Sequence, residues 1–142
     1  MKTAVVFLSA MLIIFVSCSK KEDTKLTAFS TEAFAYGMDD SSEVDATTRI
    51  KGFQQKEKND TTFTATISYD IDLVTPKGDT VKSLLTRVVD RMQREKMSDT
   101  QLDAQFDLDS TFAKGKYKLI FRIKDVLSGQ TATTSANFNL GD

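Results

Sequence analysis

The stretch FTATISYDIDL, residues 63–73, decides the fold. Apolar side chains occupy every second position and polar side chains fill the positions between: Phe63, Ala65, Ile67, Tyr69, Ile71 and Leu73 against Thr64, Thr66, Ser68, Asp70 and Asp72. Alternate residues of a strand point to one face, whereas in a helix they point in different directions. The stretch therefore predicts a β-strand with one buried and one solvated face. A turn is expected at Pro76-Lys77-Gly78-Asp79, because proline presets φ and glycine permits a positive φ.

Similar alternation predicts further strands over residues 102–108, 117–124 and 132–140. Ser128-Gly129 lies between the last two runs, so these runs predict a closing hairpin. Phe34, Tyr36 and Met38 indicate an earlier strand, and residues 50–55 indicate a weaker one.

The segment from Ser83 to Met97 departs from this period. Leu85, Val88, Val89 and Met92 are spaced for one face of a helix, among residues that favour helices. The alternative is a strand from Thr80 to Leu85 and then a loop. We favour a strand over residues 80–86, followed by a short helix or an ordered loop.

Six or seven short strands predict an all-β fold, an antiparallel sandwich of about seven strands. Gly115-Lys116-Tyr117 begins the penultimate strand and resembles the tyrosine corner of immunoglobulin-like domains, in which the ring hydroxyl bonds back to nearby backbone. The resemblance implies an immunoglobulin-like β-sandwich. The paired cysteines and the tryptophan of antibody domains are absent from the sequence, so the resemblance concerns fold and implies no activity.

The first seventeen residues have the form of a secretory signal. Lys2 precedes an apolar run from Ala4 to Val16, which as a helix would be about 20 Å long and too short to cross a bilayer comfortably. A charged start, a short apolar run and a small residue before the cleavage point define such a signal. We therefore expect residues 1–17 to be removed.

Phe15-Val16-Ser17-Cys18 resembles the lipobox of bacterial lipoproteins, with Phe15 where leucine is more usual. The resemblance implies cleavage before Cys18, a diacylglyceryl group on its sulfur and acylation of the new amine, with palmitate typical of such chains. Each buried methylene contributes about 0.8 kcal/mol, so two or three chains hold the protein on a membrane. Membrane lipid is thus the first expected partner. An ordinary signal peptide with a chance cysteine is the alternative.

Lys20, Lys21, Glu22 and Asp23 follow the cysteine and resemble the export signal of cell-surface lipoproteins in some Gram-negative bacteria. The expected location is the outer membrane, lipid-anchored and facing outward. A solvated tether beside the headgroups is the other interpretation. The expected organisation is a signal peptide (1–17), a lipidated cysteine with its tether (18–27) and one sandwich domain (28–142).

Composition argues against several function classes. The chain has 142 residues, with 19 basic and 20 acidic side chains and no basic run that would follow phosphates, so no nucleic-acid partner is expected. It has no histidine and no tryptophan, and Cys18 is its only cysteine. Histidine is the side chain best suited to proton transfer near neutral pH, and no serine lies in a recognisable nucleophile motif. We expect neither an enzyme nor a cofactor.

Carboxylates offer the remaining chemistry. Asp70 and Asp72 share one strand face, as do the three acids of the strand at 102–108 and its end, Asp103, Asp107 and Asp109. Paired acids serve glycosidases, but alternating acids are also what a solvated strand face requires. Calcium accepts oxygen ligands alone, and the weak candidates for it are Asp39, Asp40, Glu43 and Asp45. Their spacing is not that of a calcium loop.

Aromatic residues give a further hypothesis. Glycan-binding faces expose aromatic rings, and Tyr36, Tyr69 and Tyr117 are the amphipathic candidates, although the alternation assigns all three to the core. The phenylalanines outside the alternation are expected in loops: Phe29, Phe53 and Phe112. Thr61, Thr80 and Ser110 each follow an aspartate and precede a small or apolar residue, which resembles an O-glycosylation motif of some Gram-negative bacteria.

The sequence therefore predicts a membrane-anchored lipoprotein with a non-catalytic binding or scaffolding role toward a protein or glycan. Two alternatives remain: a structural accessory subunit of an envelope or nutrient-uptake complex, and a small glycan-binding module.

Overall fold

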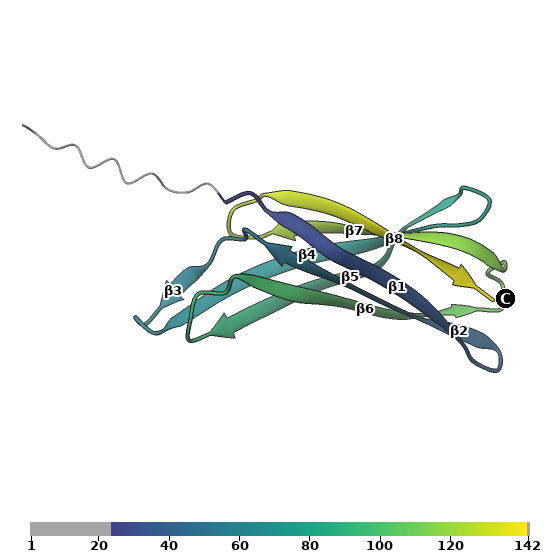
Figure 1. Cartoon of the computed structure of the whole chain (residues 1–142), viewed down its shortest axis with the longest axis horizontal. Helices are drawn as coiled ribbons and strands as arrows, with labels where there is room; N and C mark the ends of the chain where they lie inside the picture. Colours follow the sequence, from purple (N-terminus) through teal and green to yellow (C-terminus); the bar gives the residue numbers. More distant parts are fainter. Residues whose placement is uncertain (1–23, 142) are drawn as a thin grey trace, which may run out of the picture.

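A computed structural model describes residues 24–141, and these form a sandwich of two antiparallel sheets (Figure 1). Eight strands follow one another in the described part, with no helix between them: β1 (Thr27–Gly37), β2 (Ser41–Lys51), β3 (Lys56–Lys58), β4 (Thr62–Val74), β5 (Thr80–Gln93), β6 (Asp99–Asp109), β7 (Gly115–Asp125) and β8 (Thr131–Leu140). The expected all-β sandwich is confirmed.

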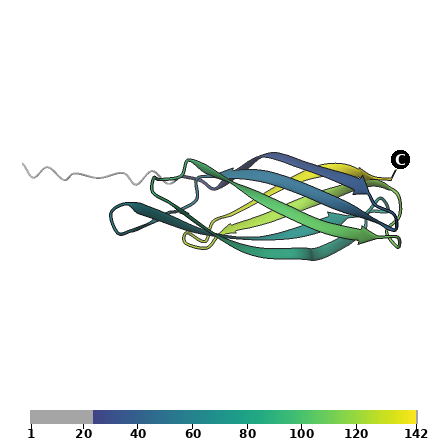
Figure 2. The same ribbon diagram turned by 90° about the horizontal axis from the view of Figure 1, so that it is seen from below.

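The connectivity is immunoglobulin-like. One sheet has the order β1-β2-β6, and the other has β4 between β5 and β7, with β8 beyond β7 and the short β3 on the end of β4. Strands A, B and E of an immunoglobulin domain share one sheet and strands C, F and G share the other. The positions of β1, β2 and β6 match the first set, and those of β4, β7 and β8 match the second. Figure 2 shows the two layers from the side.

The core lies between the layers and uses the apolar face expected for residues 63–73. Ile67, Ile71 and Leu73 of β4 are fully buried, and Leu119 and Phe121 of the neighbouring β7 meet them there. The Tyr69 hydroxyl crosses the core and donates to the carbonyl oxygen of Asp103 on the opposite sheet. The alternation expected for β4, β6, β7 and β8 is confirmed.

A hydroxyl cluster joins the two sheets along their shared side, where β1 lies against β8. The positive φ of Ser30 marks a bulge in β1 that turns Thr31 inward. There the Thr31 hydroxyl is 2.8 Å from that of Thr48 on β2 and 2.7 Å from that of Thr134 on β8. Thr48, although fully buried, is thus hydrogen-bonded, as buried hydroxyls require.

The tyrosine corner is present. Tyr117 is buried at the start of β7, and its hydroxyl donates to the carbonyl oxygen of Ala113 at 2.6 Å. Its ring stacks on Phe138 of β8 with centroids 5.5 Å apart. The expected turns also form: the Thr75 amide donates to the Asp79 carbonyl around Gly78, and Gly129 adopts a positive φ between β7 and β8.

Three expectations about strands were wrong. Residues 80–93 form one strand, β5, with an irregularity at Ser83, and no helix follows within the described residues. Because β4 supplies continuous pairing partners from Leu85 to Gln93, this pairing overrides the helical preference of the segment. The weak strand expected at 50–55 is instead the end of β2, which stops at Lys51, before the positive φ of Gly52. Phe29 lies in β1 rather than in a loop, while Phe53 and Phe112 lie outside strands and pack on the core.

The sandwich begins earlier than expected. Leu26 is buried in the core, and its amide donates to the Gln130 side chain at 2.8 Å. A Cβ on Gly52 would overlap the carbonyl of Lys25, so the glycine permits this close approach. Residues 24–27 thus pack on the folded domain although they fall within the expected tether. Among the described residues, no helix is long and apolar enough to cross a membrane.

Candidate interaction surface

The two ends of the sandwich differ in what they contain. The near end is where Thr24 enters, and it also holds the loops at 52–55, 94–98 and 126–130. The far end holds the hairpin at 38–40, the turn at 75–79, the turn at 110–114 and Gly141 (Figure 1). Whatever precedes Thr24 therefore attaches at the near end.

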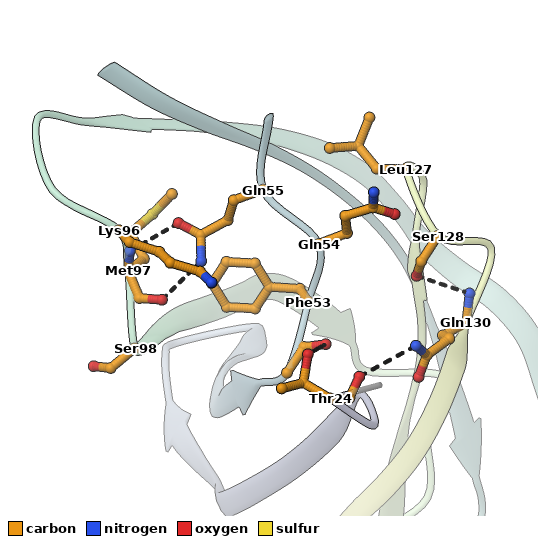
Figure 3. A pocket seen from close by; sticks show the side chains of 11 residues that line it. Thr24, Phe53, Gln54, Gln55, Lys96, Met97, Ser98, Leu127, Ser128 and Gln130 are labelled. Atoms are coloured by element: carbon orange, nitrogen blue, oxygen red, sulfur yellow. Dashed lines mark hydrogen bonds between the residues drawn. The ribbon is translucent and has the colours of Figure 1, made fainter. Parts of the chain in front are cut away.

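An open groove of about 620 Å³ lies at the near end (Figure 3). Phe53 and Met97 are buried beneath it, and glutamine side chains form much of its walls. Gln55 donates to the Met97 carbonyl at 2.8 Å and accepts from the Met97 amide at 2.7 Å. Gln130 accepts from the Leu26 amide and donates to the Thr24 carbonyl at 3.2 Å. Both amides are thus used to tie loops together.

A buried carboxylate, that of Asp125, joins two loops of the near end by hydrogen bonds. Asp125 is fully buried and accepts from the Gln54 amide at 2.7 Å, the Leu127 amide at 3.1 Å and the Ser128 hydroxyl at 2.6 Å. Its oxygens therefore hold the loop after β2 against the hairpin after β7. The side-chain amides of Gln55 and Gln130 and the Asp125 carboxylate are thus engaged in hydrogen bonds within the protein, and they hold the loops of the near end together. No sequence pattern had singled out Asp125, Gln55 or Gln130.

The exposed apolar residues of β1 form a second candidate surface. Phe34, Tyr36 and Met38 are 53%, 54% and 59% exposed; the first two lie on the outer side of β1, and Met38 follows in the hairpin at the far end. The assignment of Tyr36 to the core was wrong, because the inward positions of β1 are the small residues Ala33 and Ala35. Tyr69 and Tyr117 are buried as expected.

Carboxylates surround these side chains. In the cross-strand rows of the outer surface, Tyr36 pairs with Glu43 and then Asp107, and Phe34 pairs with Asp45 and then Gln105. The next row toward the near end is Glu32, Thr47 and Asp103. None of these three rows contains a basic residue. We call this surface, with Phe34 and Tyr36, the acidic face.

The expected calcium ligands do not gather at one point. Asp39 and Asp40 lie in the hairpin after β1, whereas Glu43 and Asp45 lie along β2 in separate rows of the acidic face. Within residues 24–141, no group of three acidic, histidine or cysteine side chains is placed to hold a metal ion.

The expectation that Asp70 and Asp72 share a solvated face was half wrong. Asp72 is buried and takes hydrogen bonds from Arg122 at 2.8 and 3.1 Å and from the Ser83 amide at 2.8 Å. The hydrogen bonds from Arg122 lower the pKa of Asp72, with smaller contributions from Ser83 and from nearby charge. Asp70 is less buried and lies 3.5 Å from the same guanidinium. Asp103, Asp107 and Asp109 are exposed.

The remaining predicted sites divide into two groups. Thr61, Thr80 and Ser110 are all exposed, at a turn, a strand start and a turn, so each hydroxyl is on the surface. Cys18 and the residues of the expected export signal (Lys20, Lys21, Glu22 and Asp23) lie outside the described residues.

The fold and this surface define a class, an all-β immunoglobulin-like sandwich with an acidic, partly aromatic outer face. Comparison with known proteins adds no family, since no family model and no curated protein matches the chain. Two solved structures are similar at 12% identity: "X-ray structure of Northeast Structural Genomics Consortium target SoR45" (TM-score 0.43, 84% of this chain and 88% of that one) and "Structure of the N-terminal domain of PorA" (TM-score 0.42, 83% and 88%).

Proposed function

We propose that this chain is an outer-membrane lipoprotein that binds or scaffolds a partner through its acidic face and has no catalytic role. The observation that carries the binding role is the exposed run Phe34, Tyr36 and Met38, because apolar side chains gathered on a soluble surface mark interaction sites. The run extends to the far end of the sandwich, away from Thr24 (Figure 1).

The lipid anchor is supported by the lipobox-like residues before and at Cys18. Five residues separate Cys18 from Thr24, so a lipid on Cys18 would hold the near end at the membrane and point the far end away from it. The acidic face would then be presented beyond the headgroups. Lys20, Lys21, Glu22 and Asp23 support display at the cell surface through their resemblance to an export signal.

Mass spectrometry of the protein from its native host tests the anchor. We expect a first residue Cys18 that carries acyl chains, and a Cys18→Ser variant that leaves the membrane fraction. An unmodified Cys18, or an intact residue 1, would refute the anchor. Protease treatment of whole cells tests the orientation: digestion supports surface display, and protection that ends on lysis refutes it.

Mild detergent extraction tests the binding role. We expect a partner to co-purify with the native protein and to be lost from a Phe34→Ser/Tyr36→Ser variant. Val88 and Met92 on β5 are each 64% exposed, so Val88→Ser/Met92→Ser is a matched control that keeps the partner. Equal recovery of the partner with both variants would rule out the acidic face.

Two related functions are distinguished by the same extraction. A stoichiometric partner from an envelope or uptake complex would make the chain an accessory subunit. The exposed ring of Tyr36 favours glycan binding as a second candidate, since aromatic rings stack on sugars. Retention on a glycan array without any co-purifying protein, abolished by Tyr36→Ser, would select this candidate.

Modification by sugar is a separate proposal. Thr61, Thr80 and Ser110 are exposed and stand in the motif described above, which supports O-glycosylation at these three positions. Intact-mass measurement on the native protein and on a Thr61→Ala/Thr80→Ala/Ser110→Ala variant tests it. An identical glycan mass on both proteins would refute it.

A further inference from the structure

The outer surfaces of the two sheets carry opposite charge at the far end. The acidic face lies on the β1-β2-β6 sheet, whereas the outward side chains of β7 at that end are Lys116 and Lys118. Asn139 and Asn137 of β8 stand beside these lysines in the same rows. All four side chains are exposed. We call this surface the basic strip.

A contact between the sheets fixes how the acidic face and the basic strip are aligned along the long axis of the sandwich. We call the position of a residue along this axis its height. The hydroxyls of Thr31 on β1 and Thr134 on β8 are 2.7 Å apart, and both strands run from the near end to the far end. Counting forward from this contact, Phe34 lies at the height of Asn137 and Tyr36 at that of Asn139.

The cross-strand pairs extend this alignment to the charges. Glu43 shares the row of Tyr36, and Lys116 shares the row of Asn139. Asp45 shares the row of Phe34, and Lys118 shares the row of Asn137. Each carboxylate of β2 therefore has a lysine of β7 at its own height on the opposite surface of the molecule.

We propose that the partner of the acidic face is the basic strip of a second copy of this chain, an inference that rests on the binding role proposed above. A copy displaced along the normal to the sheets, without rotation, places Lys116 opposite Glu43 and Lys118 opposite Asp45. The strands of aligned sheets stay within about 30° of each other, so the rows remain in register over the far half. Phe34 and Tyr36 then cover the asparagines of β8.

This arrangement leaves every near end on the same side. Copies related by a displacement have parallel long axes, so all of them can be anchored in one membrane. The contact joins two different surfaces and does not close, so it adds copies in an open row. A two-fold contact through either surface would give pairs only.

The association is expected to be weak and sensitive to salt. Exposed ion pairs contribute about 0.2–1 kcal/mol each, and salt screens them over a Debye length of about 10 Å at 0.1 M. Anchoring in a membrane raises the effective concentration of the copies and thereby favours such contacts. At the near half of the acidic sheet Asp99 is paired with Arg49 within the chain, so the proposed contact uses only the carboxylates of the far half.

Cysteine cross-linking of the full-length protein in native membranes tests the geometry. Two tagged chains, Asp45→Cys and Lys118→Cys, are produced in one cell and exposed to an oxidant. We expect disulfide-linked pairs of unlike chains and no pairs of like chains above the background of the unaltered protein. One chain with both changes is expected to give a ladder of dimers, trimers and longer species. Pairs of Asp45→Cys with itself, or no pairs at all, would overturn the proposal.

Charge exchange is an independent test in a cross-linking assay with a non-selective photoreactive reagent, whose yield does not depend on the number of lysines. Glu43→Lys/Asp45→Lys is expected to reduce self-cross-linking about tenfold, the factor that corresponds to a loss of about 1.4 kcal/mol. Adding Lys116→Glu/Lys118→Glu to the same chain makes every contact attractive again and is expected to restore it. Lys124→Glu, on the same strand but toward the near end, is the control that leaves it unchanged. Failure of the four-site variant to regain cross-linking would refute the pairing.

These results are separable from the lipid anchor. If Cys18 is unmodified but unlike chains still cross-link, the self-association stands and the membrane role fails. If Cys18 is acylated and Asp45→Cys cross-links only to a different protein, the anchor and the binding role stand and the second copy is the wrong partner.

Discussion

The hydroxyl of Tyr117 donates a hydrogen bond of 2.6 Å to the carbonyl oxygen of Ala113, four residues earlier in the chain. The bond fixes the turn at 110–114 against the start of β7. The Tyr117 ring is buried between the sheets and stacks on Phe138, so the same residue also serves the core.

Removing this hydroxyl is expected to weaken the fold without changing it. Tyr117→Phe keeps the ring and loses one hydrogen bond, so the free energy of unfolding should fall by about 1 kcal/mol. Urea denaturation of the purified protein measures it. Tyr36→Phe, which removes an exposed hydroxyl, is the control and should leave the unfolding midpoint unchanged. If both changes shift the unfolding midpoint equally, the hydrogen bond of the tyrosine corner makes no specific contribution to the free energy of unfolding.

The strands that the sequence predicted well are those with large apolar side chains at every second position. β4 and β7 place Ile67, Ile71, Leu119 and Phe121 in the core, and a period of two is unmistakable there. β2 gave a much weaker signal, since its buried positions include Ala46 and Thr48 as well as Val44 and Ile50. Thr48 is buried only because Thr31 and the Phe29 carbonyl satisfy its hydroxyl, and no local pattern reveals those partners.

The errors at Tyr36 and β5 have related causes. β1 buries Ala33 and exposes Tyr36, so the larger residue indicated the wrong face. In β5 the exposed Val88 and Met92 lie on one face and Val89 on the other, which imitates helical spacing in an edge strand. Tertiary pairing decided both outcomes: pairing with β2 accompanies the outward orientation of Tyr36 in β1, and pairing with β4 makes residues 80–93 a strand. Likewise, the relation between the acidic face and the basic strip depends on β1 lying beside β8, which the sequence alone does not show.

The pair formed by Asp72 and Arg122 predicts how stability depends on pH. Hydrogen bonds from Arg122 hold the pKa of Asp72 below its ordinary value of about 3.9 in the folded protein. A lowered folded pKa adds stability above the unfolded pKa, and this contribution disappears as the pH falls from about 4 through the folded value. We therefore expect the free energy of unfolding to fall along this acid limb, and Asp72→Asn to be less stable at neutral pH with a flatter acid limb.

Denaturation at a series of acid pH values checks this prediction. Asp107→Asn changes an exposed carboxyl on β6 and is the matched control, expected to retain the slope of the unaltered protein. If the free energy of unfolding of Asp72→Asn falls as steeply at acid pH as that of the unaltered protein, the pH dependence arises from other carboxyl groups.

Position 52 is expected to accept no residue other than glycine without loss of stability. Its φ is +79°, and a Cβ there would overlap the Lys25 carbonyl. Gly129 has a similar φ of +75° with open space around it, so Gly129→Ala measures the cost of the backbone conformation alone. We expect Gly52→Ala to lower the free energy of unfolding by about 2 kcal/mol more than Gly129→Ala, since the overlap must displace residues 24–26. Thermal unfolding of both variants measures the difference, and equal midpoints would contradict the packing of Lys25 and Leu26 on Gly52.

Two arginines on the free edge of β5 are expected to prevent this strand from pairing with a strand of another molecule. Within the described residues β5 pairs only with β4, so one side of this 14-residue strand has unpaired backbone groups. Arg87 and Arg91 face the inner side of that edge, opposite Tyr69 and Ala65. Arg91 reaches across to β6, donating to the Thr100 hydroxyl at 3.1 Å and to the Gln101 carbonyl at 2.9 Å. Inward charges on an edge strand oppose pairing with another chain, because docking would bury them.

Replacing both arginines by valine is therefore expected to make the protein aggregate through β5. Arg87→Val/Arg91→Val would extend the apolar row of Leu85 and Val89 along the free edge, and light scattering should show large species at concentrations where the unaltered protein is dispersed. Lys82→Val/Lys124→Val removes the same number of charges from outside this inner row and should stay dispersed. Aggregates of Arg87→Val/Arg91→Val would form through apolar side chains and backbone pairing, so they should persist in high salt. Rows of copies joined through the ion pairs of Lys116 and Lys118 should instead dissolve in high salt. Aggregation of both double variants alike would assign the effect to net charge and would remove the protective role from the two arginines.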